Sequence, residues 1–208
     1  KNSLMVAGMA TIAAVALAVP AGWAVSRTPS VGWSLSLVIA TYMLPPVALA
    51  VPLYGQMARL KRMALPLCVS LLVGSLTACL SAVAIGWALG ASPSSLLSLA
   101  PKSATAPVAM GIVEKLGGIP SLTAAVVILT GITGAVGAPW VLDRIGIREP
   151  AVRGFAMGLA SHGIGTARAF QISEQTGAFA ALAMGLNGLF TALTLPWLLP
   201  MVAGLLKP

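Results

Sequence analysis

The chain has 208 residues, of which 58% are hydrophobic and 8% are charged, and its formal net charge is +8. Roughly a quarter of the residues of a soluble domain are charged, so this composition excludes an ordinary soluble domain and predicts an all-α integral membrane protein. The basic residues gather at the ends of apolar runs, where membrane proteins keep their positive charge. The net charge therefore does not indicate a nucleic-acid partner.

Long uncharged runs predict about five membrane crossings, which we place at residues 4–25, 32–55, 63–90, 119–142 and 178–205. Each run matches or exceeds the roughly 20 apolar residues that a helix needs to cross the hydrocarbon core. The first run is too long for a cleaved signal peptide, and further spans follow it. Because residue 1 is Lys rather than Met, we expect that an upstream piece is missing.

The second and third runs carry further local signals. Prolines 45, 46 and 52 remove backbone donors and should kink the second crossing. The basic cluster Arg59, Lys61 and Arg62 predicts that the loop after this crossing is cytoplasmic. Cys68 and Cys79 in the third run fit no metal spacing, and we expect both to be reduced, buried fillers. No metal and no cofactor are expected.

Two stretches, residues 92–118 and 149–177, do not fit ordinary crossings. Each combines two short helical pieces with a break rich in Gly, Pro, Ser and Thr, and each piece, at roughly 10–13 residues, is too short to cross alone. The stretches are either re-entrant hairpins or broken helices that cross. The three arginines of the loop at residues 143–153 favour hairpins, because that arrangement keeps the loop cytoplasmic.

The two stretches also resemble each other. "TAPVAMGIVEKLGG" from Thr105 aligns with "TARAFQISEQTGA" from Thr166 with one gap, so that Glu114 meets Glu174, and the helix after each stretch carries a Pro-Trp pair. If both stretches are hairpins, the two units enter from opposite faces as an inverted repeat, which is a transporter architecture. We therefore expect scaffold-like helices at residues 1–91 and a transport-like domain at 92–208, with repeats at 92–142 and 149–205.

Polar residues at the two breaks predict an anion site. Thr105 is expected to cap the half-helix after the first break, and Gly165 or Thr166 the half-helix after the second. Two such N-termini that face each other inside the membrane attract negative charge. Lys102 and Arg168 lie beside these caps, and Arg168 can hold a carboxylate through two parallel hydrogen bonds. The site suits a small monocarboxylate.

The predicted substrate-binding residues share a polar group or a backbone that a ligand can approach, and they are Lys102, Ser103, Thr105, Ser161, His162, Gly163, Gly165, Thr166, Arg168 and Asn187. His162 titrates near neutral pH and is a candidate for proton coupling, as are Glu114 and Glu174. Structural alternatives stay open for Arg168, His162, the two glutamates and Asn187. In these alternatives Arg168 pairs with a glutamate, and His162 is buried against a carbonyl. The glutamates are then helix-end charges at the membrane surface, and Asn187 makes a packing hydrogen bond.

An enzyme is not expected from this sequence. It contains no HExxH, no CxxC and no pair of intramembrane aspartates. Ser161 and His162 are adjacent, so their side chains diverge and do not form a nucleophile and its base.

Four segments, "ALAVPLYGQ", "LAPKSATAPVAMGIVEKLGGIPSLTA", "ASHGIGTARAF" and "GAFAALAMGLNGLFTAL", resemble the LrgB/CidB family. The resemblance runs from about Thr41 to the C-terminus, and the further helix with which the family usually begins is not found here. It implies two functions. One is a holin/antiholin-like component that tunes murein hydrolase activity and cell lysis with a small LrgA/CidA-like partner. The other is carboxylate transport, of pyruvate or, in the similar plastid translocator, of glycolate and glycerate.

The family pattern agrees with the predicted site at Lys102, Ser103, Thr105, His162, Gly163, Gly165, Thr166 and Arg168. We predict a multi-pass transporter of small monocarboxylates in a bacterial cytoplasmic (inner) membrane, with proton coupling left open, and keep the antiholin-like regulator as the alternative. The expected partners are the carboxylate, the lipid bilayer and an LrgA/CidA-like small membrane protein. Because inverted-repeat transporters often dimerise, we also expect a homodimer through the first three helices.

Overall fold

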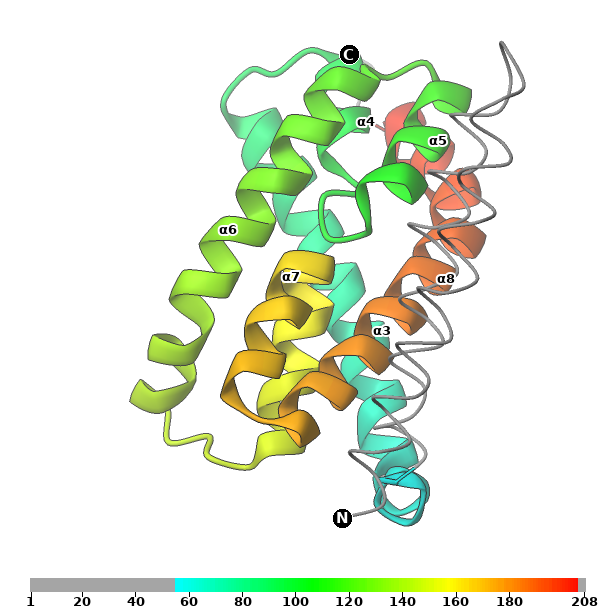
Figure 1. Ribbon diagram of the computed structural model, residues 1–208. Helices are drawn as coiled ribbons and strands as arrows, with labels where there is room; N and C mark the ends of the chain where they lie inside the picture. Colours follow the sequence, from blue (N-terminus) through cyan, green and yellow to red (C-terminus); the bar gives the residue numbers. More distant parts are fainter. Residues whose placement is uncertain (1–54, 206–208) are drawn as a thin grey trace, which may run out of the picture. The chain divides into compact units, whose positions relative to one another are not determined.

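The computed structural model describes residues 55–205, which form helices and no strand (Figure 1). The predicted crossing at 4–25 and nearly all of the one at 32–55, with its prolines, lie outside the described residues. The chain divides into two compact units, Lys1–Met57 and Ala58–Pro208, and the second unit contains every residue of the predicted site. Its six helices are α3 Met57–Ala88, α4 Pro93–Leu99, α5 Ala106–Leu116, α6 Pro120–Arg144, α7 Pro150–Ile172 and α8 Glu174–Leu205.

Three of these helices are long and apolar enough to cross a membrane, namely α3, α6 and the Glu174–Leu199 part of α8. They lie where the sequence predicts the third, fourth and fifth crossings, so the chain is an α-helical membrane protein. The α3 helix begins at Met57, six residues before the predicted start at 63. Arg59, Lys61 and Arg62 therefore lie in its first turns rather than in a loop, because lysine and arginine favour helix and reach water through long side chains.

The first unusual stretch forms a hairpin of two short helices. Ser92 caps α4 by accepting a hydrogen bond from the backbone N–H of Ser95 (3.3 Å). The chain is non-helical at residues 100–105, and α5 then runs to Gly117, whose φ of 79° closes the helix in the left-handed conformation. Gly118 packs against Leu97 and Ser98 of α4. The end of α5 thus returns to the side of α4.

The second unusual stretch, α7, reverses direction at His162. The backbone of His162 has φ 41° and ψ −131°, which interrupts an otherwise helical segment. Met157 and Ala169 lie in one buried cluster, although they would be about 18 Å apart along a straight helix. The chain must therefore fold back on itself, so α7 is a hairpin of two half-helices that meet at His162.

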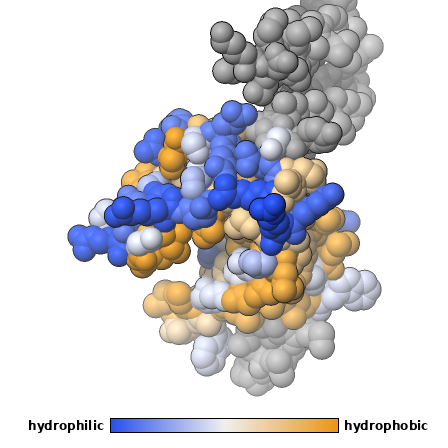
Figure 2. Space-filling model, turned by 90° about the horizontal axis from the view of Figure 1, so that it is seen from below, coloured by the Kyte–Doolittle hydropathy of each residue, from blue (hydrophilic) through white to orange (hydrophobic). Residues whose placement is uncertain are grey.

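The ends of the helices show that both stretches turn back rather than cross. An ion pair between Arg59 and Glu149 joins the start of α3 to the start of α7. Because α3 leads away from this end and α6 leads back to it, α4–α5 must enter and leave at the opposite end (Figure 1). Figure 2 shows hydrophilic side chains gathered across the end that carries the ion pair. The hairpin alternative therefore describes both stretches in this structure, and the crossing alternative does not.

Packing is closest between α7 and α8. A Cβ atom on Gly154 would lie 2.0 Å from the carbonyl oxygen of Thr176, and one on Gly158 would lie 2.0 Å from that of Ala180. Only glycine lets the two backbones approach so closely. By contrast, α3 meets its neighbours through side chains, as where Gly74 receives the side chain of Leu159. The second hairpin and α8 thus form one tightly packed body.

Candidate functional site

A cavity of about 590 Å³ lies between α3, the first break, α6 and the first half of α7. The first break contributes Lys102 and Ser103, and Ser161 comes from the residue just before the bend at His162. The remaining lining residues are apolar, small or hydroxylic, and they are Gly74, Ala78, Val126, Leu129, Thr130, Thr133, Gly134, Ala156, Leu159 and Ala160. A mostly apolar wall with a few convergent polar groups is typical of small-molecule sites.

Two buried hydroxyl groups at this cavity have no partner. Ser103 and Ser161 are 8% and 0% exposed, and neither hydroxyl oxygen makes a hydrogen bond within the described part of the chain. A buried polar group without a partner costs about 1–3 kcal/mol. One of the two hydroxyl groups lies at each hairpin tip. A ligand that hydrogen-bonds to both would remove the free-energy cost of leaving them without partners.

Lys102 supplies the charge of the site. Among the described residues that line the cavity it is the only charged one, and it is partly buried. It lies three residues before Thr105, which has extended backbone angles and occupies the predicted N-cap position of α5, although its side chain makes no capping hydrogen bond. The positive end of the α5 dipole and the ammonium group therefore lie in the same segment, which favours an anion.

Two glycines of α6 let the second hairpin tip approach. A Cβ atom on Gly134 would lie 1.6 Å from Oγ of Ser161, and one on Gly131 would lie 2.7 Å from Cε1 of His162. Neither position tolerates a side chain unless the tip moves away. The sequence alone gives no signal for these two glycines, because their role depends on which residue of another helix faces them.

His162 holds the second tip in place. Its φ of 41° is the only positive value among the non-glycine residues that the structure describes, and a residue in this region carries strain. The ring is 5% exposed, and its Nε2 hydrogen-bonds with the backbone carbonyl of Val127 in α6 (2.9 Å). The structure thus matches the alternative of a buried histidine against a carbonyl. A role for His162 in binding or proton coupling stays a prediction.

The predicted second helix cap at Gly165 or Thr166 is wrong, because the chain leaves the helix at His162 and has resumed it before either residue. Gly165 is buried and packs against the backbone carbonyl of Met157 and the side chain of Ser161. The hydroxyl of Thr166 donates back to the carbonyl of His162 (2.7 Å). Gly163 is exposed beside the bend. None of Gly163, Gly165 and Thr166 is among the residues that line the cavity.

Arg168 is not brought to the cavity. Its side chain is exposed and donates to the amide oxygen of Gln171 one turn further along α7 (2.9 Å). The ion pairs in the described residues join Arg59 to Glu149 and Arg153 to Asp143, so the proposed pairing of Arg168 with a glutamate is not formed there.

The two predicted coupling glutamates lie far along the chain from the breaks. Glu114 is exposed in the last turn of α5, and Glu174 is exposed as the first residue of α8. These positions fit the alternative of helix-end charges. They also differ from each other, because one residue ends a helix and the other begins one. The structure therefore gives no support to the residue-by-residue alignment from Thr105 and Thr166.

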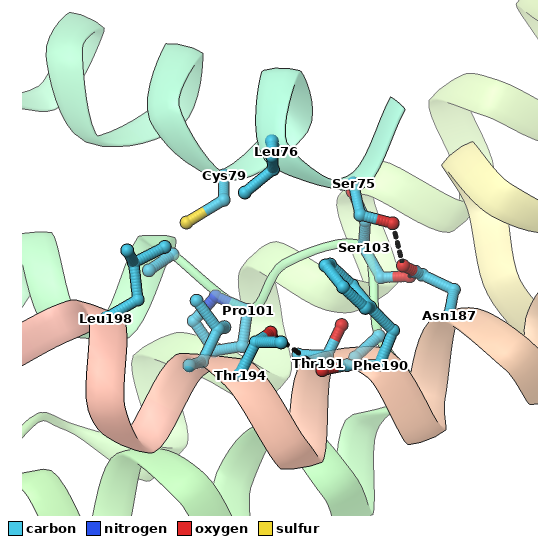
Figure 3. A pocket seen from close by; sticks show the side chains of 13 residues that line it. Ser75, Leu76, Cys79, Pro101, Ser103, Asn187, Phe190, Thr191, Thr194 and Leu198 are labelled. Atoms are coloured by element: carbon cyan, nitrogen blue, oxygen red, sulfur yellow. Dashed lines mark hydrogen bonds between the residues drawn. The ribbon is translucent and has the colours of Figure 1, made fainter. Parts of the chain in front are cut away.

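Asn187 of α8 lies in a second, much smaller cavity of about 20 Å³, shown in Figure 3. It is 1% exposed. Its Oδ1 accepts from the hydroxyl of Ser75 (2.6 Å), and its Nδ2 donates to the carbonyls of Ser103 (2.9 Å) and Leu159 (3.4 Å). The structure thus shows the packing role that the sequence left open. Cys79 is buried in the same cavity, whereas Cys68 is exposed, contrary to the prediction that both are buried.

Three helices that are long and apolar enough to cross a membrane and two helical hairpins whose tips share one cavity define an α-helical membrane protein. The LrgB-like family model matches residues 33–201. The chain belongs to the LrgB-like family, which confirms the LrgB side of the resemblance.

Relatives support the same assignment. The chain is 36% identical over 175 residues to "Uncharacterized protein YwbG" of Bacillus subtilis (strain 168), which covers 83% of this chain and 78% of that protein. It is 31% identical over 157 residues to "Antiholin-like protein LrgB" of Bacillus cereus (strain B4264), which covers 75% of this chain and 68% of that protein. No solved structure matches the chain.

Proposed function

We propose that this chain is a secondary transporter or channel-like facilitator of small monocarboxylates such as pyruvate, glycolate or glycerate. The observation that carries the proposal is the shared cavity, to which one hairpin tip brings Lys102 and Ser103 and the other brings Ser161. A carboxylate accepts several hydrogen bonds, and those from a charged donor are the strongest. The hydroxyl groups are suited to the second carboxylate oxygen or to the neighbouring carbonyl or hydroxyl of the substrate.

The charge of the cavity favours a monoanion over a dianion. Lys102 is the single cation among the described lining residues, so a second negative charge would stay uncompensated. Burying an unpaired charge in surroundings this apolar is costly. Thr130 and Thr133 of α6 add hydroxyl groups to the wall, which suits a short oxygen-rich substrate.

The proposed transport mechanism uses the two hairpins as an inverted repeat. The units α4–α5–α6 and α7–α8 each pair one hairpin with one long helix, and the hairpins approach the cavity from opposite ends (Figure 1). Trp140 of α6 and Trp197 of α8 each directly follow a proline, and both are exposed. Hairpin tips that meet at a binding site fit alternating access by an inverted-repeat transporter.

We further propose that the protein lies in a bacterial cytoplasmic membrane, acts without catalysing a chemical reaction, and associates as a homodimer or with an LrgA/CidA-like small membrane protein. The second candidate function is an antiholin-like regulator of murein hydrolase activity and lysis. It is supported at the family level by the name of the Bacillus cereus relative. A partner-dependent regulator has no need of a cationic cavity between two hairpin tips, so the cavity favours transport.

Uptake of labelled pyruvate and glycolate into proteoliposomes tests the proposal. Loss of the ammonium group in Lys102→Ala should lower uptake by about 10- to 100-fold, because hydrogen bonds to charged groups contribute about 1.5–3 kcal/mol. Lys115→Ala is the matched control, since Lys115 is exposed at the other end of the same hairpin. Equal uptake by Lys102→Ala and Lys115→Ala would contradict the site. Dye leakage that requires the protein but does not change when carboxylates are added would instead favour the antiholin-like function.

A further inference from the structure

The α3 helix is joined to the other described helices by hydrogen bonds at only two places in the described part of the chain. One is the Arg59–Glu149 ion pair at its start, and the other is the Ser75–Asn187 hydrogen bond in its middle (2.6 Å). Ser75 is 9% exposed and Asn187 is 1% exposed. Elsewhere α3 packs through apolar contacts, as where Gly74 receives Leu159 and Gly86 receives Leu96 and Leu99. Apolar surfaces can slide past each other, whereas a buried hydrogen bond has to break.

The side chain of Asn187 also contacts both hairpin tips. Its amide group donates to the carbonyl of Ser103 within the first break and to the carbonyl of Leu159, two residues before Ser161 at the second tip. Both amide protons and the amide oxygen are therefore used, each on a different element. One side chain of α8 thereby connects α3 and both sides of the 590 Å³ cavity.

We propose that Asn187 is a positioning residue that ties the two hairpin tips together, and that the Ser75–Asn187 hydrogen bond is a latch that opens when the tips move against α3. The close backbone contacts of Gly154 and Gly158 with α8 keep the second hairpin and Asn187 in one body. The bond to Leu159 therefore travels with that body, the bond to Ser103 carries the first tip along with it, and the bond to Ser75 opens. The latch itself does not depend on the proposed function; only the statement that this motion belongs to transport rests on it.

Native Cys79 is a built-in reporter for the latch. It lies one turn after Ser75 on α3, is 7% exposed, and lines the small cavity together with Ser75 and Asn187 (Figure 3). In the full chain with Cys68→Ser, the rate at which a membrane-permeant maleimide modifies Cys79 measures how often this region opens. The experiment is carried out in proteoliposomes without any carboxylate, so its outcome does not depend on transport activity.

Ser75→Ala should raise the modification rate of Cys79 about threefold, the effect of an average interhelical hydrogen bond in a membrane. Asn187→Ala should raise it about tenfold or more, because the bonds to both tips are also lost. The double variant should react no faster than Asn187→Ala alone, since the two changes remove the same latch bond. Ser81→Ala is the control, because within the described part of the chain this exposed α3 serine bonds only to the Ala78 carbonyl of its own helix.

An unchanged rate in Ser75→Ala, or additive effects of Ser75→Ala and Asn187→Ala, would overturn the proposal. If Asn187→Ala does not fold, the comparison of Ser75→Ala with Ser81→Ala decides alone. If the reporter behaves as expected and no carboxylate is taken up, the proposed transport function fails while the latch stands.

Discussion

The two hairpins reach the same cavity by different local structures. The first breaks over residues 100–105 and carries Lys102 and Ser103 on non-helical backbone. The second bends at His162 alone, and its ring and backbone carbonyl are both hydrogen-bonded. Within the residues that the structure describes, each tip leaves one buried serine hydroxyl without a partner. The first tip thus presents a charge, whereas the second tip is held in position by its hydrogen bonds.

The largest expected effect comes from forcing the second tip out of position. Gly134→Ala would place a Cβ atom 1.6 Å from Oγ of Ser161, and overpacking of this kind typically costs about 1–3 kcal/mol. We expect a lower melting temperature and near-complete loss of pyruvate uptake. In Gly137→Ala, on the same helix, the added Cβ atom would meet no atom of the described residues within 4 Å, so this variant should behave like the unmodified protein. If both variants behave alike, the close approach of α6 and the second tip is not important.

The next effect concerns the strain and the anchor at His162. His162→Ala keeps a positive φ on a residue with a Cβ atom and loses the bond to Val127, so it should destabilise the protein by about 2 kcal/mol. His162→Gly loses the same bond but accepts the φ of 41° freely. The glycine variant should therefore melt at a higher temperature than the alanine variant. The reverse order would show that the bend in solution does not have this backbone conformation.

The smallest effect is expected at Arg168. Its guanidinium group is exposed and bonds to Gln171 rather than to the cavity. Arg168→Gln should therefore change the concentration of pyruvate that gives half-maximal uptake by less than about twofold, within the range of a surface substitution. A tenfold rise in this half-maximal concentration, at unchanged melting temperature, would show that Arg168 belongs to the binding site. Both hairpins would then contribute a charged residue, contrary to the difference described above.

The sequence predicts the first hairpin better than the second, for a physical reason. The first hairpin can be located from local sequence signals. Ser92, Thr105 and Pro107 mark the helix starts, and Gly117 marks an end. The second break lies at a histidine in the run Ser161–Gly165, whose serine and two glycines predict a break but do not fix the residue at which the chain bends. Its position is set by the Val127 carbonyl on α6, a tertiary contact that no local pattern encodes.

The same limit explains the outcome for the candidate site. Lys102, Ser103 and Ser161, which lie at the two breaks, line one cavity, and their part in substrate binding stays a prediction. Arg168 does not line the cavity, because the direction of its side chain depends on where α7 bends. The bend lies at residue 162 rather than at 165, and this shift changes the side of the half-helix on which Arg168 lies. The latch bond of Asn187 to Ser75 joins residues 112 positions apart. Such a pair becomes visible only in the folded chain.

The central claim is that both hairpin tips bind one small carboxylate, and substrate protection tests it most directly. Single cysteines at Ser103→Cys and Ser161→Cys, in a Cys68→Ser and Cys79→Ser background, are modified by maleimide over a range of pyruvate concentrations. We predict that pyruvate slows modification at both positions with the same half-maximal concentration, and that Lys102→Ala raises that concentration at both. Protection at one position only, or at neither, would contradict a shared site.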